Sequence, residues 1–336
     1  MESLFDINLY SRQITTYGKE TMEKIIYLKI LIIGLRGFGI EITKNIILLG
    51  PKLVKVYDKN LCTINDQCAN FYIDDKDIGK KSRDEACINK LQKLNPYVEV
   101  SILREKEIFE IINDFNAIIV TEIMDINYLF ELNKRCRTNN IKFIYAACLG
   151  LTGFVFNDFG EEHLIINETG EQPASFYIKN IIKNNSTIII DNSNNQNMSL
   201  NTGSMIRLRE IQGMNELNDG KIRKIKLLSS DSFSIDEDLS SYGEYIRGGI
   251  VEEIKIPKKI KFYSLEERFE KPFEDKIPKF LDYSKKGNNQ LLHCGIIALH
   301  QFYSKYQKLP EINDMEEGKE IIKITKDIFN LCLKNK

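Results

Sequence analysis

The chain has 336 residues, of which 43% are hydrophobic and 28% charged, and its 47 basic and 48 acidic side chains leave a formal net charge of -1. This composition is typical of globular proteins, and the length predicts about two domains at roughly 150 residues each. A near-zero charge with scattered lysines argues against a nucleic-acid partner, which would favour a basic excess or a concentrated basic stripe.

Short β-branched runs alternate with helical patterns in the first half of the chain. Strands are expected at Lys29–Ile33, Leu53–Asp58, Asn116–Thr121 and Ile141–Ala146, with helices at Gly37–Leu49, Ser82–Leu94 and Asn127–Thr138. This alternation predicts parallel strands joined by right-handed crossover helices. The expected fold class is therefore α/β, a Rossmann-like doubly wound sheet with helices on both faces.

The pattern changes after Gly150. Short apolar alternations at Ser186–Ile190, Ser204–Leu208 and Lys224–Leu228 lie between turn signals and predict a small antiparallel, barrel-like β-module. The Asn-rich run from Asn192 to Asn201 is interpreted as a flexible hairpin loop. Helical periodicity returns after Pro257, most clearly over Gln290–Tyr306, so the α/β architecture is interrupted and then resumed.

A glycine-rich turn joins the first strand to the first crossover helix. Gly34 and Gly39 hold the first and third positions of a dinucleotide-binding turn, but Arg36 occupies the second, where a long side chain can fill the space of a pyrophosphate. Asp58 ends the next strand, where a ribose-binding acid would lie. We favour the interpretation that these glycines permit tight turning and helix packing; nucleotide binding in the turn is the alternative.

The seven cysteines are odd in number, widely spaced and free of any C-x-x-C pair, so reduced thiols and no cysteine-rich metal site are expected. Packing or surface roles are favoured for His163, His293 and His300. The chain has neither a run of about 18 apolar residues nor a basic N-terminal signal. We therefore expect no membrane partner and predict a cytoplasmic and nuclear location.

Several short motifs resemble, in order, the N-terminal half of the ubiquitin-activating enzyme family. They are Leu9–Gln13, Gly34–Asn45, Asp75–Lys80, Asp158–Glu162, Gly170–Pro173, Glu210–Met214, Tyr245–Val251 and Ala298–Phe302. In that family, two ThiF-like adenylation folds pack as a pseudo-dimer, one active and one inactive. The resemblance implies an inactive adenylation domain at 1–169 and 254–336. It also implies that 170–253 is the first catalytic-cysteine half-domain, which carries no catalytic cysteine.

The resemblance also implies that this chain lacks catalytic groups. The family's Asn-Arg-Gln trio, which grips ATP phosphates, corresponds here to Cys68, Ala69 and Asn70, and the metal-binding aspartate falls near Ile126 or Asn127, with Asp125 out of register. A degenerate pseudo-site of Gly34, Arg36, Gly37, Gly39 and Asp58 is therefore not expected to bind nucleotide tightly. We expect no adenylation and no cofactor in this chain alone, with ATP and magnesium bound by the full enzyme.

One residue is expected to contribute to the chemistry. By resemblance, Arg12 reaches across the pseudo-dimer to the terminal phosphate of ATP in the active domain, a task suited to a guanidinium. The implied partners are that active adenylation domain and ubiquitin. Acids of the β-module, Asp231, Asp236, Glu237 and Asp238, could face a basic partner such as ubiquitin, although a solvated loop is favoured.

The leading hypothesis is a non-catalytic half of an enzyme that adenylates the ubiquitin C-terminus and passes it to a cysteine as a thioester. The chain is expected to be a fragment of that enzyme. A separate regulatory subunit of the kind used in SUMO activation is the second hypothesis. A nicotinamide-dependent oxidoreductase built on Gly34, Gly39 and Asp58 is the third, opposed by Arg36 and by the lack of an acid-base pair.

Overall fold

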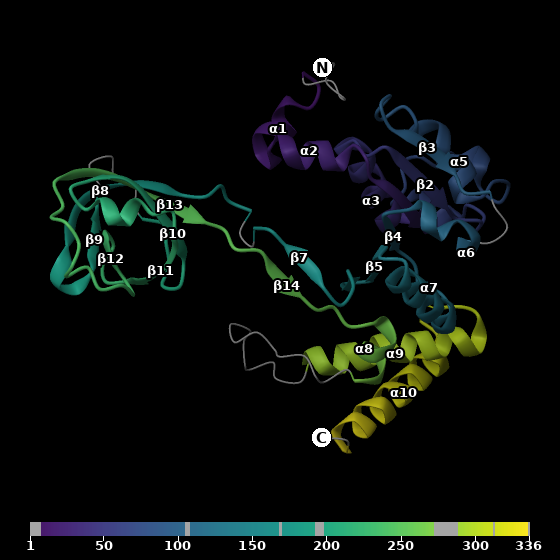
Figure 1. The fold of residues 1–336 in the computed structure, drawn as a ribbon. Coiled ribbons are helices and arrows are strands. Elements are labelled where there is room, and N and C mark those ends of the chain that lie inside the picture. Colours follow the sequence, from purple (N-terminus) through teal and green to yellow (C-terminus); the bar gives the residue numbers. More distant parts are fainter. Residues whose placement is uncertain are drawn as a thin grey trace. The chain divides into compact units, whose positions relative to one another are not determined.

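The computed structural model describes residues 8–104, 108–167, 170–191, 198–271, 288–311 and 313–334. The chain divides into two compact units, one formed by Met1–Glu162 with Lys261–Lys336 and one by His163–Ile260 (Figure 1). The expected boundaries of the β-module, 170 and 253, lie inside the second unit. Residues 192–197 of the expected Asn-rich loop lie outside the described residues.

The first unit is built on a mixed six-stranded sheet with the order β3-β2-β1-β4-β5-β6. The strands are β1 (Lys29–Ile33), β2 (Leu53–Tyr57), β3 (Glu99–Ile102), β4 (Ala117–Val120), β5 (Lys142–Leu149) and β6 (Thr152–Asp158). All neighbours are parallel except β5 and β6. This confirms the predicted Rossmann-like fold, with an antiparallel strand added at one edge.

The helices of this unit are α1 (Ser11–Tyr17), α2 (Lys19–Ile25), α3 (Gly37–Leu49), α4 (Ile64–Gln67), α5 (Arg83–Leu91), α6 (Ile108–Ile111), α7 (Ile126–Thr138), α8 (Leu265–Glu270), α9 (Asn288–Tyr306) and α10 (Met315–Lys334). Alternate residues of β1 enter two separate apolar clusters. Ile30 and Ile32 belong to the cluster that includes α3 and α5, whereas Leu31 and Ile33 belong to the cluster that includes α7. Because successive side chains of a strand point to opposite faces, the sheet is covered on both sides.

Two strands of this six-stranded sheet, β3 and β6, were not predicted, and both lie at its edges. β3 is only four residues long, and β6 contains Gly153, which reads as a turn signal in the sequence. A Cβ on Gly153 would lie 2.9 Å from the Ala147 carbonyl oxygen of β5, so glycine permits a close approach of the two backbones. A strand glycine can mark such an approach as well as a loop.

The second unit is a closed antiparallel barrel with the order β10-β11-β12-β9-β8-β13, which confirms the predicted barrel-like module. Its strands are β8 (Ser175–Ile182), β9 (Thr187–Ile190), β10 (Met205–Gln212), β11 (Ile222–Leu227), β12 (Ser232–Ile235) and β13 (Arg247–Ile254). Ile206, Leu208 and Ile211 of β10 point into the core while the arginines between them are exposed. This alternation is the sequence signal from which the module was predicted.

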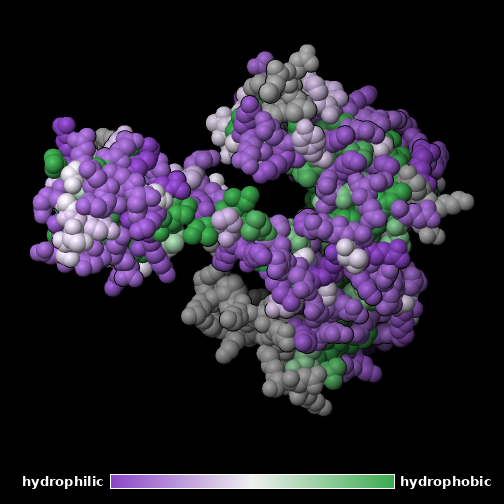
Figure 2. Space-filling model, in the orientation of Figure 1, coloured by the Kyte–Doolittle hydropathy of each residue, from purple (hydrophilic) through white to green (hydrophobic). Residues whose placement is uncertain are grey.

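A two-stranded antiparallel ribbon of β7 (His163–Ile165) and β14 (Lys258–Ile260) completes the second unit. Leu164, Ile166 and Ile256 expose about half or more of their surface on or beside the ribbon. Figure 2 shows hydrophobic residues at the surface next to the barrel. Short 3-10 helices occur at Asp75–Asp77, Ile112–Asp114, Lys183–Asn185 and Asn215–Asn218. No helix in the described parts of the chain is long and apolar enough to cross a membrane.

A buried polar network ties α9 to the sheet. His300 is 1% exposed; its Nε2 lies 2.9 Å from the Tyr145 hydroxyl of β5, and its Nδ1 lies 3.2 Å from the Met124 carbonyl oxygen. A carbonyl can only accept, so Nδ1 carries the proton and Nε2 accepts from Tyr145. Burial lowers the pKa of His300 to about 4, opposed by the Met124 carbonyl and the charge of Asp125. The neutral ring is therefore the native form.

We predict that His300 makes the stability of the chain depend on pH. Its folded pKa is below its unfolded value, so the unfolded chain binds more protons between pH 6.5 and about 4, and stability falls as pH decreases through that window. The contribution of this histidine is up to about 3 kcal/mol. Urea unfolding at several pH values should show a flatter profile for His300→Gln than for the parent chain in that range.

The matched control is His293→Gln, a change at a partly exposed histidine on the same helix. It should leave the slope between pH 6.5 and 4 nearly unchanged. Identical slopes for the parent chain and for His300→Gln would contradict the prediction.

Candidate functional site

The glycine turn after β1 has the geometry of a phosphate-binding turn. Gly34 adopts a φ of +96°, and its amide donates to the Tyr57 carbonyl oxygen of β2 at 3.0 Å. Gly39 lies in the first turn of α3, where a Cβ would come within 2.2 Å of the Gly34 carbonyl oxygen. Gly37 is equally crowded, because a Cβ there would lie 2.4 Å from the Cβ of Ala69. Tight turning and close packing therefore require these glycines whether or not a ligand binds.

Asp58 follows β2 and is 3% exposed. Its Oδ2 accepts the Leu35 amide of the turn at 2.8 Å, and its Oδ1 accepts the Asn60 amide at 3.1 Å. The carboxylate that would face a ribose thus holds the turn itself. Its position at the carboxyl end of a parallel strand is where α/β folds place ligand-binding groups.

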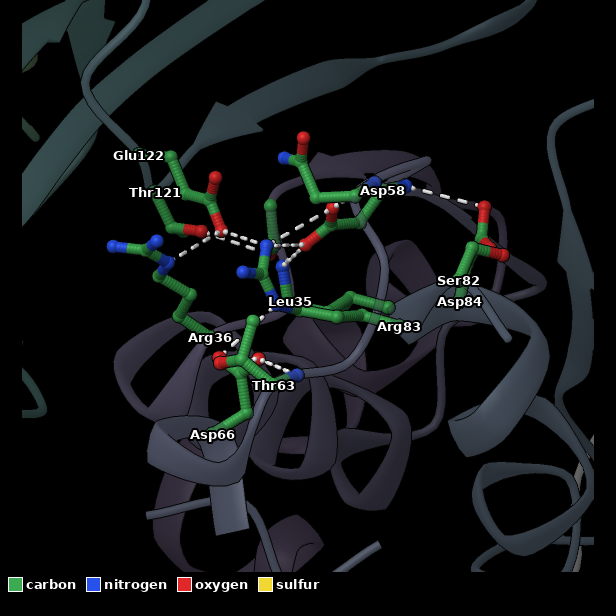
Figure 3. A network of polar contacts seen from close by, with 12 residues as sticks. Leu35, Arg36, Asp58, Thr63, Asp66, Ser82, Arg83, Asp84, Thr121 and Glu122 are labelled. Atoms are coloured by element: carbon green, nitrogen blue, oxygen red, sulfur yellow. Dashed lines mark hydrogen bonds and ion pairs between the residues drawn. The ribbon is translucent and has the colours of Figure 1, made fainter. Parts of the chain in front are cut away.

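Arg83, the first residue of α5, is buried at this turn with 2% of its surface exposed (Figure 3). Its Nη1 lies 3.2 Å from Asp58 Oδ2 and 3.3 Å from Glu122 Oε1, and its Nε lies 3.0 Å from Asp66 Oδ1. One guanidinium therefore joins the end of β2, helix α4 and the segment after β4. The fork of donors on arginine suits such multiple pairing.

Arg36 lies at the rim of the turn. Its side chain is 57% exposed, and its Nε lies 3.8 Å from Glu122 Oε1 at the rim of the network. Arg36 is the N-cap residue of α3 and has an extended backbone conformation. Its side chain points toward Glu122 (Figure 3). The buried guanidinium at this turn is that of Arg83, and whether Arg36 excludes a pyrophosphate stays a prediction.

The charges in this cluster are unbalanced. Three carboxylates, those of Asp58, Asp66 and Glu122, surround the single buried guanidinium of Arg83. Burial raises the pKa of Glu122, the charge of Asp58 raises it further, and Arg83 and Arg36 oppose the shift. Burial alone would lower the pKa of Arg83, but its carboxylate partners raise it overall. The turn thus presents acidic groups where a phosphate would need donors.

The residues that correspond to the family's ATP-gripping trio contribute to the packing and hydrogen bonds of this loop. Cys68 is exposed, Ala69 packs against Gly37, and Asn70 is buried. The Asn70 amide donates to the Leu35 carbonyl oxygen at 3.0 Å, and its Oδ1 accepts the Tyr72 amide at 3.0 Å. The amide nitrogen and the amide oxygen of the Asn70 side chain are therefore both hydrogen-bonded to the protein backbone.

Asp125 acts as the N-cap of α7. Its Oδ1 accepts the amides of Asn127 and Tyr128 at 3.0 and 3.1 Å, and its Oδ2 accepts the Ser304 hydroxyl at 3.2 Å. These bonds satisfy backbone donors at the start of a helix. Among the described residues, no group of three or more His, Cys, Asp or Glu side chains has the arrangement of a metal site.

Arg12 lies on α1 and is exposed. No ion pair to its guanidinium is found within the described ranges of the chain. In the second unit, Glu237 is engaged rather than solvated, because it accepts from Arg223 Nε at 2.5 Å and from the Tyr242 hydroxyl at 2.8 Å. Of the four acids considered for contact with a basic partner, Glu237 is therefore bonded within the barrel.

Sequence reasoning missed Arg83 and Glu122, the two residues that define the buried network. Glu122 directly follows a predicted strand, Asn116–Thr121, and the ends of parallel strands are where polar groups gather. Arg83 begins a helix, where a basic residue is unfavourable beside the positive end of the helix dipole. An arginine in that position, with acids at two strand ends, is the signal that could have found the cluster.

Comparisons with known proteins agree with this architecture. Residues 10–169 match the ThiF family, residues 184–255 the FCCH domain of ubiquitin-activating enzyme E1, and residues 256–329 the four-helix bundle of ubiquitin-activating enzyme E1. Among solved structures, E. coli MccB is 20% identical, with a TM-score of 0.37, over 42% of this chain and 45% of MccB. That likeness is too low to carry an argument.

Two similar relatives are ubiquitin-activating enzymes. Ubiquitin-activating enzyme E1 2 of Arabidopsis thaliana is 37% identical over 325 residues, which are 96% of this chain and 30% of the relative. Ubiquitin-like modifier-activating enzyme 1 of Homo sapiens is 34% identical over 329 residues, which are 97% of this chain and 30% of the relative. The chain thus spans about 30% of the length of the curated relatives that it matches.

The sheet, its glycine turn and the inserted barrel define a ThiF-like protein with the accessory modules of an E1. The three family models and these relatives together match the chain to a part of the N-terminal half of the ubiquitin-activating enzymes E1.

We predict that Arg83→Leu destabilises the chain by about 3–5 kcal/mol near pH 7, because it leaves the buried carboxylates of Asp58 and Asp66 without their buried counter-ion. Part of this loss should be recovered as pH decreases and those carboxylates take up protons. The free energy of unfolding, measured with urea at pH 7 and pH 5, checks both statements.

Arg135→Leu serves as the control, since Arg135 pairs with Glu131 on an exposed helix face at 2.7 Å. A surface pair of this kind contributes less than about 1 kcal/mol. Equal losses for the two variants would show that the buried cluster is not needed for stability.

Proposed function

We propose that this chain is a non-catalytic part of a ubiquitin-activating enzyme. In the complete enzyme, ATP with magnesium adenylates the ubiquitin C-terminus, and the ubiquitin then forms a thioester with a cysteine. The part described here scaffolds the active adenylation domain as one half of a pseudo-dimer and contributes to ubiquitin binding. The location in the cytoplasm and nucleus stays a prediction.

The observation that carries the proposal is the buried network at the glycine turn. A triphosphate is strongly anionic, and its binding sites offer backbone amides, guanidinium groups and a metal ion. At this turn the Leu35 amide is already bonded to Asp58, and Arg83 is consumed by three carboxylates. The residues present do not fit a bound nucleotide, so we assign ATP and magnesium to the active domain.

Two buried cysteines and the barrel are unsuited to carrying the thioester. Cys87 and Cys136 are buried, and burial raises the pKa of each thiol to about 12, which leaves very little thiolate near neutral pH. The sequence has no cysteine between Cys148 and Cys294, so the barrel carries no thiol nucleophile.

The role proposed for Arg12 is to stabilise negative charge on the terminal phosphate of ATP held by the active domain. A guanidinium remains charged and offers several donors in a planar fork, which suits a phosphate supplied from another domain. Arg12 is exposed on α1 and no described residue forms an ion pair with it. It is therefore available to a partner domain, in contrast to Arg83.

The match to the ubiquitin-type FCCH domain over residues 184–255 supports the ubiquitin enzyme over the SUMO-type subunit. The relatives named above are ubiquitin-activating enzymes, so the oxidoreductase alternative has no support from them.

We predict that Arg12→Ala lowers kcat/KM for ATP in ubiquitin adenylation by about 10- to 100-fold, the effect of losing a charge-assisted hydrogen bond. Pyrophosphate exchange should be measured with this chain and the active adenylation domain together, as one polypeptide or two. Arg12→Lys should recover only part of the rate, because an ammonium keeps the charge but loses the fork. Unchanged exchange in Arg12→Ala would remove Arg12 from the proposal.

We predict that this chain alone gives no heat of binding when titrated with ATP and magnesium up to about 1 mM, the concentration at which weak complexes with free energies near -4 kcal/mol become detectable. The complete enzyme, titrated in the same buffer, is the positive control. Micromolar binding by the isolated chain would overturn the assignment of a degenerate turn.

A further inference from the structure

Helix α1, which carries Arg12, has no buried residue of its own. Its attachment to the first unit is made by the residues on one face. Gln13 Nε2 donates to the Leu48 carbonyl oxygen at 3.4 Å, a long hydrogen bond, and Gln13 and Ile14 are only partly buried. The direction of α1 therefore depends on its first turn and on α2, which follows it directly and buries Met22.

Tyr10 makes that attachment. It is the N-cap residue of α1, its carbonyl oxygen accepts the Ile14 amide at 2.9 Å, and only 3% of its surface is exposed. The Tyr10 hydroxyl accepts from Asn95 Nδ2 at 2.8 Å. A single residue thus begins the helix and fastens it to the body of the unit.

The socket for the Tyr10 ring is formed by two other segments of the chain. Asn95 is 4% exposed; its Nδ2 also donates to the Ile47 carbonyl oxygen at 3.1 Å. Gly50 ends α3 with a φ of +91°, and a Cβ on it would lie 2.6 Å from the Tyr10 hydroxyl oxygen and 2.7 Å from Cε1. Glycine is needed there both for the backbone conformation and to admit the ring.

Helix geometry links this socket to Arg12. Residues three or four apart share a helix face, whereas residues two apart point to well-separated sides. Tyr10, Gln13 and Ile14 therefore face the body of the unit, and Arg12 faces away from it. We infer that Tyr10, held by Asn95 and Gly50, is a positioning residue that sets the direction in which Arg12 projects toward the terminal phosphate.

The surrounding packing cannot replace this contact. A cavity of about 260 Å³ adjoins the socket and is lined by Leu9, Tyr10, Gln13, Leu48, Leu94, Asn95 and Pro96. With free volume beside the ring, a weakened Tyr10 allows α1 to tilt instead of being retained by neighbouring side chains. A misplacement of the guanidinium by about 1 Å is enough to lose much of its effect on the reacting phosphate.

This inference rests on the proposed role of Arg12, and the test separates the two. Tyr10→Phe and Tyr10→Ala are compared with Arg12→Ala and with the two double variants, in pyrophosphate exchange by this chain together with the active adenylation domain. Tyr10→Phe removes one buried hydrogen bond and should lower kcat/KM for ATP by about 3- to 10-fold. Tyr10→Ala should approach the loss seen for Arg12→Ala, while KM for ubiquitin stays unchanged.

In the Arg12→Ala background, either change at Tyr10 should add less than about twofold, since residues acting as one unit are not additive. Tyr27→Phe is the matched control, because Tyr27 is 56% exposed and its loss of a hydroxyl should have no effect. The unfolding midpoint of each variant verifies that the chain remains folded.

Three results would be decisive. The positioning role would be overturned if a change at Tyr10 lowered kcat/KM for ATP as much in the Arg12→Ala background as in the parent chain. It would also be overturned if the change raised KM for ubiquitin, since either result would indicate general damage. An Arg12→Ala effect with no effect of Tyr10→Ala would overturn the inference and leave the proposed function intact. No effect of Arg12→Ala would instead remove the proposed function of Arg12, and the inference with it.

Discussion

The first unit depends on the burial of one guanidinium at the carboxyl edge of its sheet. Arg83 pairs with Asp58, Asp66 and Glu122, and so joins the ends of two central strands, a short helix and the start of α5. Burying a charge is costly unless it is paired and hydrogen-bonded, so these four residues have to be retained together. The same interaction fixes the glycine turn, because Asp58 also holds the Leu35 amide.

This arrangement supports the proposal that the glycine turn of this chain does not bind nucleotide. The features that belong to the backbone, the glycines and the strand-turn-helix geometry, remain because packing requires them. Beside the turn lies an internal ion-pair network in which three carboxyl groups surround the guanidinium of Arg83. The cation at this turn, the Arg83 guanidinium, already pairs with Asp58, Asp66 and Glu122. A triphosphate would have to compete with these three carboxyl groups for it.

Arg83 and Arg12 differ in how far their side chains are exposed. Arg83 is buried and forms ion pairs with three carboxyl groups of its own unit, so it acts on the fold. Arg12 is exposed on a helix whose opposite side is fastened by Tyr10, so its charge is directed outward. In the barrel, Arg223 is likewise buried, and it pairs with Asp219 and Glu237.

The sequence by itself determined the α/β class, the barrel insertion, and the bounds of β1 and α3, because hydrophobic periodicity and glycine turns are local signals. It also determined the family, through motifs spread along most of the chain. Only the tertiary structure decided which arginine is buried at the turn, because Arg83 meets its partners from positions up to 39 residues away. The edge strands β3 and β6 and the socket of Tyr10, whose partner Asn95 is 85 residues distant, were likewise decided by tertiary contacts. Pairing over such separations depends on the register of the sheet, which no local pattern specifies.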